Sequence, residues 1–476
     1  MKGITFFLLL VTFSVLHSQP VTLRDTTNQY DYIIITVPEF VSACEPFKQH
    51  KETVRDFRTL IVDTTQIIAE FDSSATPQDN IRNFISYAGT FWKEPRAKYF
   101  LIVGTVQMVP NFQIPFQYTY LQSDYYYSQN IYETDSTTTD FYIGRIPSKN
   151  VTEIENYFIK VIDFESDGSL HPWMNNTLFL CEDEPYFGFI DHAFYLSGIF
   201  PPYIRSYFIV DSDSSAYYGN KDSIYKAINE RGCATLWFLG HGSDSFFISR
   251  DYFNIEDLIG LNNQPKYFLS IFASGYSSIL DTNTNMTNEM LKLYNAGSIG
   301  GIIYVGPAFW GLSQIMRSKY AERLFDPAIQ SISEAIKLDN LIPSGGLYGY
   351  MIKVTNLWAD PSLQLKYDTS VGVERIANEI PQSFMLYQNY PNPFNPTTTI
   401  KFALPVNSRV KINIYNSLGQ LVETLVDKEM ESGYHEVNFD AGGYSSGVYL
   451  YQLQAGDPST GSGQSFVSVK KMILLK

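Results

Sequence analysis

Short, continuous apolar runs alternate with amphipathic runs along the first three quarters of the chain. The apolar runs predict strands at 30–37, 60–62, 99–103, 177–181, 204–210, 233–239, 267–272 and 298–305. The amphipathic runs predict helices at 40–51, 76–88, 151–164, 191–198, 221–230, 312–325 and 328–337. Continuous apolar strands suit a parallel sheet that helices cover on both faces. The alternation therefore predicts an α/β fold, a doubly wound sheet built as two consecutive units.

The pattern changes after Asp360. Residues 367–383 are polar, and we expect them to form a linker. Beyond the linker, apolar and polar residues alternate between turns rich in Gly, Asn and Pro. This alternation predicts strands at 398–404, 409–415, 433–439, 447–453 and 465–475. Short strands in this spacing are typical of a small all-β, immunoglobulin-like sandwich.

The N-terminus has the features of a secretory signal peptide. Lys2 precedes an apolar run at 4–16, and the small residue Ser18 follows it. The run is shorter than the ~20 residues of a membrane-spanning helix, so we expect no transmembrane segment after cleavage. The expected domains are a signal peptide (1–18), an N-terminal α/β subdomain (19–148), a second α/β subdomain (149–366), the linker (367–383) and the sandwich (384–476).

Charge and cysteine content exclude two classes of protein. A net charge of −15 over 476 residues argues against nucleic-acid binding, which needs clustered Lys and Arg. Cys44, Cys181 and Cys233 form an odd, sparse set, which argues against a disulfide framework even in an exported protein. We expect three buried, unreactive thiols.

Two neighbouring predicted strands end in small residues that suit an active site. The strand at 233–239 is followed by Gly240-His241-Gly242, and the strand at 267–272 by Ala273-Ser274-Gly275. Ligands of parallel sheets bind outside the carboxyl ends of the strands. A histidine in this position can act as a general base for hydrolysis, beside backbone N–H groups that stabilise an oxyanion.

Carboxylates follow a third predicted strand at the same edge of the sheet. Glu182 and Asp183 come directly after the strand at 177–181. Calcium takes several carboxylate and carbonyl oxygens, so this run is compatible with a calcium site. No other feature indicates a metal or a cofactor, and we otherwise expect none.

The two strand ends resemble the catalytic core of gingipain-type cysteine peptidases. The matching motifs are LWFLGHGS at 236–243 and SIFASG at 270–275, with LIVG at 101–104, SDYY at 123–126, IGRIP at 143–147 and NLWADPSL at 356–363. The resemblance spans residues 30–365 and implies a caspase-like fold. It also implies His241 as general base, and a peptide-binding cleft that includes Gly240, Gly242, Gly275, Asp124 and Tyr125. We expect Tyr126, Tyr127, Trp237 and Phe272 to add apolar contacts there.

The chain departs from this family at the nucleophile. The position of the family's catalytic cysteine is taken by Phe272, or by Ala273 if the loop is shifted by one residue. Neither side chain can form a thiolate. Ser274 lies close to the expected position, but an alcohol needs stronger activation than a thiol. Cys233 begins the histidine's own strand, at the far end from His241.

The C-terminal module resembles the sorting domain that the type IX secretion system recognises. The motifs are LYQNYPNPFNPTT at 386–398, IYNSLGQL at 414–421, GYH at 433–435, SGVY at 446–449 and KKM at 470–472. The resemblance implies passage through the periplasm, export across the outer membrane by the secretion machinery, and release or attachment at the cell surface. An ordinary adhesive β-domain is the alternative.

These features lead to three hypotheses. The first is an exported, catalytically inactive member of the gingipain family that binds peptides or proteins. The second is an active endopeptidase of the cysteine or serine type. The third is an accessory of the secretion machinery.

Overall fold

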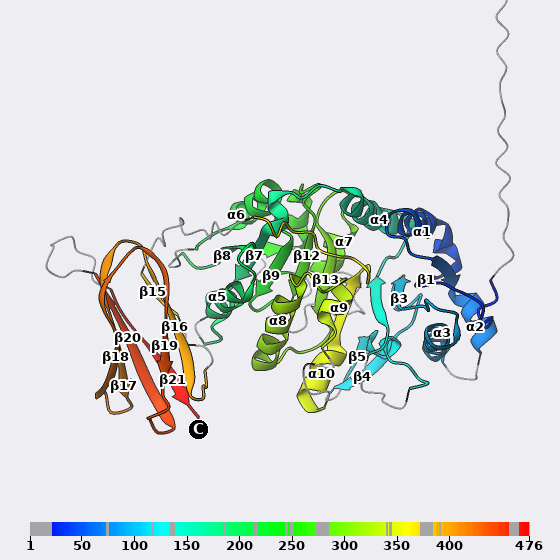
Figure 1. The fold of residues 1–476 in the computed structure, drawn as a ribbon. Coiled ribbons are helices and arrows are strands. Elements are labelled where there is room, and N and C mark those ends of the chain that lie inside the picture. Colours follow the sequence, from blue (N-terminus) through cyan, green and yellow to red (C-terminus); the bar gives the residue numbers. More distant parts are fainter. Residues whose placement is uncertain are drawn as a thin grey trace, which may run out of the picture.

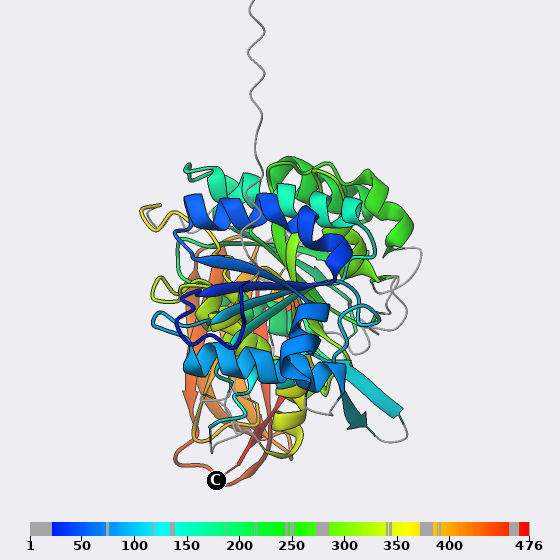
Figure 2. The same cartoon turned by 90° about the vertical axis from the view of Figure 1, so that its right-hand side faces the viewer.

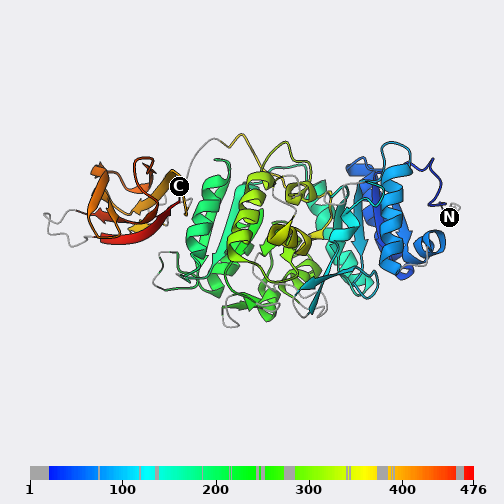
Figure 3. The same cartoon turned by 90° about the horizontal axis from the view of Figure 1, so that it is seen from below.

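The computed structural model describes residues 21–72, 76–116, 119–133, 139–184, 186–213, 215, 217–242, 246–247, 252–272, 285–338, 341, 345–371, 384–387, 389, 392–456 and 466–475. The expected signal peptide and most of the expected linker lie outside these ranges. The described residues form two α/β subdomains and a β-sandwich, arranged in a row (Figures 1 and 3).

The N-terminal subdomain is a four-stranded parallel sheet in the order β2-β1-β3-β6. The strands are β1 (Tyr32–Thr36), β2 (Thr59–Asp63), β3 (Tyr99–Val103) and β6 (Tyr142–Ile146). The helices are α1 (Val41–Val54), α2 (Thr64–Phe71), α3 (Pro77–Phe91) and α4 (Val151–Ser166). Figure 2 shows α1 and α3 on opposite faces of the sheet, as a doubly wound arrangement requires.

The segment between β3 and β6 contains a hairpin that the sequence pattern did not indicate. Strands β4 (Phe112–Phe116) and β5 (Thr119–Ser123) pair antiparallel and lead into the 3₁₀ turn η2 (Tyr125–Ser128). The segment is rich in Tyr and polar residues, which hides any regular alternation. Ile114 and Leu121 are both buried and face each other across the ladder. This cross-strand apolar pair fixes the hairpin.

The second subdomain is a six-stranded sheet in the order β14-β13-β12-β9-β7-β8. Its strands are β7 (Asn176–Cys181), β8 (Arg205–Val210), β9 (Thr235–Leu239), β12 (Phe268–Phe272), β13 (Ser298–Tyr304) and β14 (Thr355–Ala359). All neighbours are parallel except β14, which runs antiparallel to β13. We did not expect β14 as a strand. It lies beside β6 and so joins the two sheets.

Helices cover both faces of this sheet, and the buried apolar side chains form a separate hydrophobic cluster on each face. One face carries α5 (Phe189–Ile199), α8 (Trp310–Leu324) and α9 (Ile332–Ile336), and α10 (Gly346–Val354) packs against α8. The other face carries α6 (Lys221–Tyr225), the π-helical turn η4 (Lys226–Arg231), the 3₁₀ helix η5 (Ile255–Gly260) and α7 (Met286–Lys292). The core of the first face is continuous with the core of the N-terminal subdomain. The two α/β units therefore form one domain, and the predicted α/β class is confirmed.

The C-terminal part is a sandwich of two antiparallel sheets, β15-β16-β19 and β18-β17-β20-β21. The strands are β15 (Met385–Leu386), β16 (Thr397–Leu404), β17 (Ser408–Asn416), β18 (Leu421–Met430), β19 (Gly433–Asp440), β20 (Gly447–Ala455) and β21 (Phe466–Leu474). The predicted all-β class is confirmed. We did not expect β18, because only Val426 of this exposed edge strand is buried.

The sandwich contacts one side of helix α5. The Lys470 ammonium lies 3.3 Å from the Asp191 carboxylate, and the rings of Tyr387 and Phe194 are 4.6 Å apart. Asp191 and Phe194 are three residues apart, so they lie on the same side of the helix. The ion pair is partly exposed, and we therefore assign it only a small share of the docking energy.

A capping box begins α3, and its removal is expected to be measurable. The Thr76 hydroxyl accepts the Asp79 backbone N–H, and the Asp79 carboxylate accepts the Thr76 backbone N–H. Thr76→Ala is expected to lower the free energy of unfolding of the α/β domain by about 1 kcal/mol, measured by urea titration. Thr53→Ala, at an exposed position of α1, is the control, and we expect a change within about 0.5 kcal/mol. Equal effects of both changes would contradict the capping role.

Candidate active site

His241 follows β9 and is held by a carboxylate from the neighbouring strand. The His241 backbone N–H donates to Glu182 Oε2 at 2.6 Å, and His241 Nδ1 lies 2.8 Å from the same oxygen. Glu182 follows β7, which pairs with β9. Because Nδ1 is hydrogen-bonded to Glu182, Nε2 is the ring nitrogen that can accept a proton from a nucleophile.

Gly240 allows this close approach. A Cβ at position 240 would lie 2.9 Å from Glu182 Cβ, which is shorter than real contacts allow. A larger residue would push the Glu182 carboxylate away from His241. The resemblance to gingipains placed Gly240 in the expected peptide-binding cleft. The structure adds a steric requirement.

Aromatic rings pack against one side of the His241 imidazole. The Phe187 and Phe189 rings lie 4.9 Å and 5.4 Å from the His241 ring, both edge to face. Tyr186 continues this surface and is 87 % exposed. The His241 side chain is itself 55 % exposed, so solvent and ligands reach it.

Phe272 ends β12 at the position expected for the family's nucleophile, and its side chain is packed into the core. It is only 1 % exposed and contacts the rings of Phe247 at 4.8 Å and Phe238 at 6.4 Å. These rings belong to the face of the sheet covered by α6, η5 and α7. Residues Ala273, Ser274 and Gly275 lie outside the described part of the chain.

The three cysteines are buried thiols, as the sequence indicated. Burial raises the pKa of Cys233 to about 12. Burial, with a smaller effect from Glu45, raises the pKa of Cys44 to about 12. Cys181 is closer to the site, because it pairs with Leu239 at the carboxyl ends of β7 and β9. Burial raises its pKa well above the ordinary value, so no thiolate forms there near neutral pH.

Asp124 and Tyr125 lie away from His241. The Asp124 carboxylate accepts two hydrogen bonds from the Arg145 guanidinium, both at 2.7 Å, and is largely buried. The Tyr125 backbone N–H donates to Ser123 Oγ at 3.1 Å. The two hydrogen bonds between Asp124 and Arg145 therefore join the turn η2 to β6.

The expected apolar contacts of the cleft need a correction. Tyr127, Trp237 and Phe272 are buried in the core, so they offer no surface to a ligand. The aromatic residues beside His241 come from the segment after Glu182 instead. No periodic pattern marks this segment, although it is dense in aromatic residues: Tyr186, Phe187 and Phe189.

The acidic residues near the site have different roles. Glu182, expected as a binding residue or calcium ligand, is the partner of His241. The backbone N–H of Asp183 donates to Asp211 Oδ1 at 2.7 Å. Gly242 forms an antiparallel bridge with Phe247. Among the described residues, no group of three or more His, Cys, Asp or Glu side chains is placed to hold a metal ion.

The sequence profile of peptidase family C25 matches residues 25–366. The chain belongs to peptidase family C25. This confirms the gingipain-type resemblance found in the sequence.

Solved structures of gingipains share the fold of this C25 protein. The structure of the Arg-specific cysteine proteinase gingipain R (RgpB) has a TM-score of 0.61 at 14 % identity, covering 94 % of this chain and 98 % of its own. The complex of the RgpB pro- and mature domains from Porphyromonas gingivalis has a TM-score of 0.60 at 15 % identity, covering 93 % and 100 %. No curated protein matches this chain.

The C-terminal sandwich carries an export signal. The profile of the secretion system C-terminal sorting domain matches residues 388–467, which confirms the second resemblance. This domain indicates export by the type IX machinery to the cell surface or the medium. None of the helices in the described ranges combines the length and apolar character needed to cross a membrane.

Proposed function

We propose that this C25 protein is an exported peptide- or protein-binding member of the family that has lost hydrolytic activity. The observation that carries the proposal is Phe272. It ends β12 beside the histidine strand, and its ring is part of the core. Covalent catalysis by a cysteine peptidase needs a thiolate within hydrogen-bond reach of the base.

The thiols of the chain do not replace the missing nucleophile. Cys233 precedes β9, so the length of the strand separates it from His241. Cys181 is fully buried, with a raised pKa, and its backbone rather than its thiol faces the histidine strand. Cys44 lies in α1 of the other subdomain.

The surface around His241 suits a peptide ligand. Phe187 and Tyr186 are accessible, and aromatic rings give large contact areas at low entropic cost. Glu182 fixes the imidazole, which can exchange hydrogen bonds with a peptide amide. We infer that the former cleft now binds extended peptide segments without cleaving them.

An active serine-type endopeptidase is the second candidate, because the His241–Glu182 pair is intact. Ser274 is then the nucleophile. An active cysteine-type enzyme requires an unexpected thiol, and a role as an accessory of the secretion machinery has no specific structural support.

One experiment separates the two candidates. The purified full chain is incubated with a peptide library and with fluorescent thiol-directed and hydroxyl-directed probes. We expect no turnover and no labelling, together with peptide binding that Tyr186→Ala weakens by about tenfold, the loss of one aromatic contact of roughly 1.4 kcal/mol. Leu418→Ala, at a similarly exposed position in the sandwich, is the control.

Turnover that both His241→Ala and Ser274→Ala abolish would establish the serine-type enzyme instead. Turnover abolished by His241→Ala but retained in Ser274→Ala would indicate a cysteine nucleophile. Absence of both turnover and peptide binding would contradict the proposed function.

A further inference from the structure

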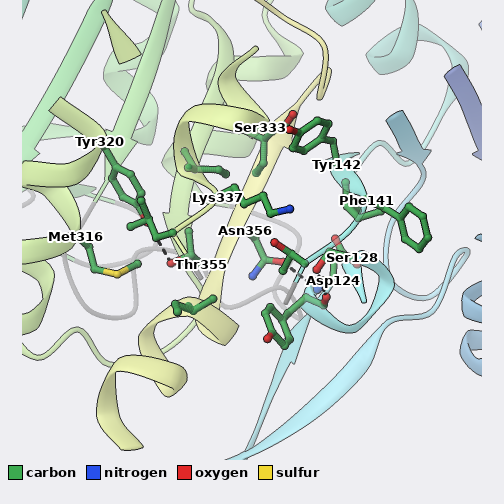
Figure 4. A pocket seen from close by; sticks show the side chains of 17 residues that line it. Asp124, Ser128, Phe141, Tyr142, Met316, Tyr320, Ser333, Lys337, Thr355 and Asn356 are labelled. Carbon is green, nitrogen blue, oxygen red and sulfur yellow. Dashed lines mark hydrogen bonds between the residues drawn. The ribbon is translucent and has the colours of Figure 1, made fainter. Parts of the chain in front are cut away.

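A cavity lies at the junction of the two α/β subdomains. It has a volume of about 90 Å³, and its walls come from β6, η2, α8, α9, α10 and β14 (Figure 4). His241, Glu182 and the aromatic residues beside them do not line it. β14 is also separated from the histidine strand β9 by β13 and β12. The cavity is therefore distinct from the candidate active site.

One ammonium group determines the charge of this cavity. Asp124 contributes a carboxylate, but Arg145 neutralises it through two hydrogen bonds. The Lys337 ammonium has neither a hydrogen bond nor an ion pair with the described residues. Its Nζ lies 6.0 Å from the centre of the Tyr142 ring. In Figure 4 the side chain extends between Asn356 and Tyr142.

The neutral polar groups of the walls already have partners. Ser128 Oγ donates to the Tyr125 carbonyl, and Thr355 Oγ1 donates to the Met351 carbonyl. Ser333 Oγ donates to a backbone carbonyl as well. The three N–H donors of Lys337 are therefore the main donors left for a ligand.

Apolar side chains complete the lining: Phe141, Ile143, Met316, Ile336, Leu338 and Leu357. An anion with an apolar stem fits this combination, because its charge meets the ammonium and its stem meets the apolar wall. A phosphate fits less well, since phosphate sites supply several convergent donors from Arg side chains or backbone N–H groups.

The volume limits the size of the ligand. At ~10–15 Å³ for each water-sized sphere, the cavity holds only a handful of waters or a ligand of similar bulk. It is smaller than the roughly 150 Å³ engineered cavity that accepts benzene. A carboxylate on a stem of two or three carbons is of this size.

We propose that this cavity binds one carboxylate group on a short aliphatic stem, with Lys337 as its counter-ion. Two sources carry this chemistry, a free short-chain carboxylic acid and the side chain of a glutamate in a peptide. Asp124 and Tyr125, which the sequence indicated as binding residues, line this cavity. The proposal is independent of the proposed function of the His241 site.

Chemical protection of Lys337 tests the proposal in the full chain. Lysines are acylated at neutral pH and constant ionic strength, with butyrate, with its uncharged isostere butyramide, or with neither. Peptide mass spectrometry then gives the rate at each lysine. At ten times Kd, butyrate is expected to slow acylation of Lys337 about tenfold by mass action. Lys319, which pairs with Glu322 on α8, is the control and should be unaffected.

Two variants and two peptides complete the test. Lys337→Arg is expected to keep the thermal stabilisation by butyrate, and Lys337→Met to lose it while retaining the unliganded melting temperature.

A tripeptide with a central Glu is compared with its Gln counterpart. Protection by the acid alone assigns a free ligand, and protection by the Glu peptide alone assigns a peptide side chain. Absence of protection by both, or equal protection by butyramide, overturns the proposal.

Discussion

Replacing Lys51 with methionine is expected to lower the free energy of unfolding of the α/β domain by about 3–5 kcal/mol. The Lys51 ammonium is completely buried between α1 and α4. It donates to both carboxylate oxygens of Glu165, at 2.9 Å and 2.8 Å, and to Asp360. Methionine keeps the apolar stem but leaves two buried carboxylates without their main counter-charge. Urea titration followed by circular dichroism measures the loss.

Lys48→Met is the matched control on the same helix. Lys48 is partly exposed, and its Nζ lies 4.0 Å from Glu45. Surface pairs of this kind contribute about 0–1 kcal/mol, so we expect a small change. A Lys51→Met variant as stable as Lys48→Met would show that the buried network is dispensable.

The buried ion pairs of Lys51 also predict how the difference in unfolding free energy between the native chain and Lys51→Met depends on pH. Burial by itself raises the pKa of Glu165, but Lys51, His50 and Arg55 outweigh burial and lower this pKa to about 2. A lowered folded-state pKa stabilises the fold above the ordinary pKa of about 4.5. The stability gap between the native chain and Lys51→Met should therefore be complete above pH 4.5. It should shrink as the pH falls from 4.5 toward 2.

Phe272→Cys is expected to destabilise the α/β domain by about 3 kcal/mol and to produce no peptidase activity. The substitution removes most of a buried ring and leaves a cavity against Phe238 and Phe247. The new thiol would lie in this apolar core, where burial opposes thiolate formation. Denaturant titration measures the loss of stability. Labelling with a thiol-directed probe in the folded state measures the reactivity.

Phe91→Cys is the control for truncating a phenylalanine at the surface. Phe91 is 43 % exposed, and its replacement is expected to cost about 1 kcal/mol or less. Ala273→Cys tests the other position at which the family's nucleophile can align. Peptide cleavage by the Phe272→Cys variant would show that its side chain reaches His241, and would refute the assignment of position 272 to the core.

The sequence determined the features that depend on local patterning. Continuous apolar runs predicted β1, β2, β3, β7, β8, β9, β12 and β13, because the central strands are buried on both faces. They did not predict β6. The start of α3 at Thr76 and His241 at a strand end were also visible, since they depend on neighbours within a few residues. The pattern missed β14 and β18. β14 is a short antiparallel strand added at the edge of the sheet, and β18 is largely exposed.

Only the tertiary structure decided which distant side chains meet. Glu182 and His241 are 59 residues apart, and Lys51 and Asp360 are 309 residues apart. No periodicity encodes such pairs, because chain packing sets them. The orientation of Phe272 is similar: both faces of β12 are apolar, so the sequence alone cannot say which face receives its ring. The same packing places Lys337 and Asp124 in the walls of one cavity between the subdomains.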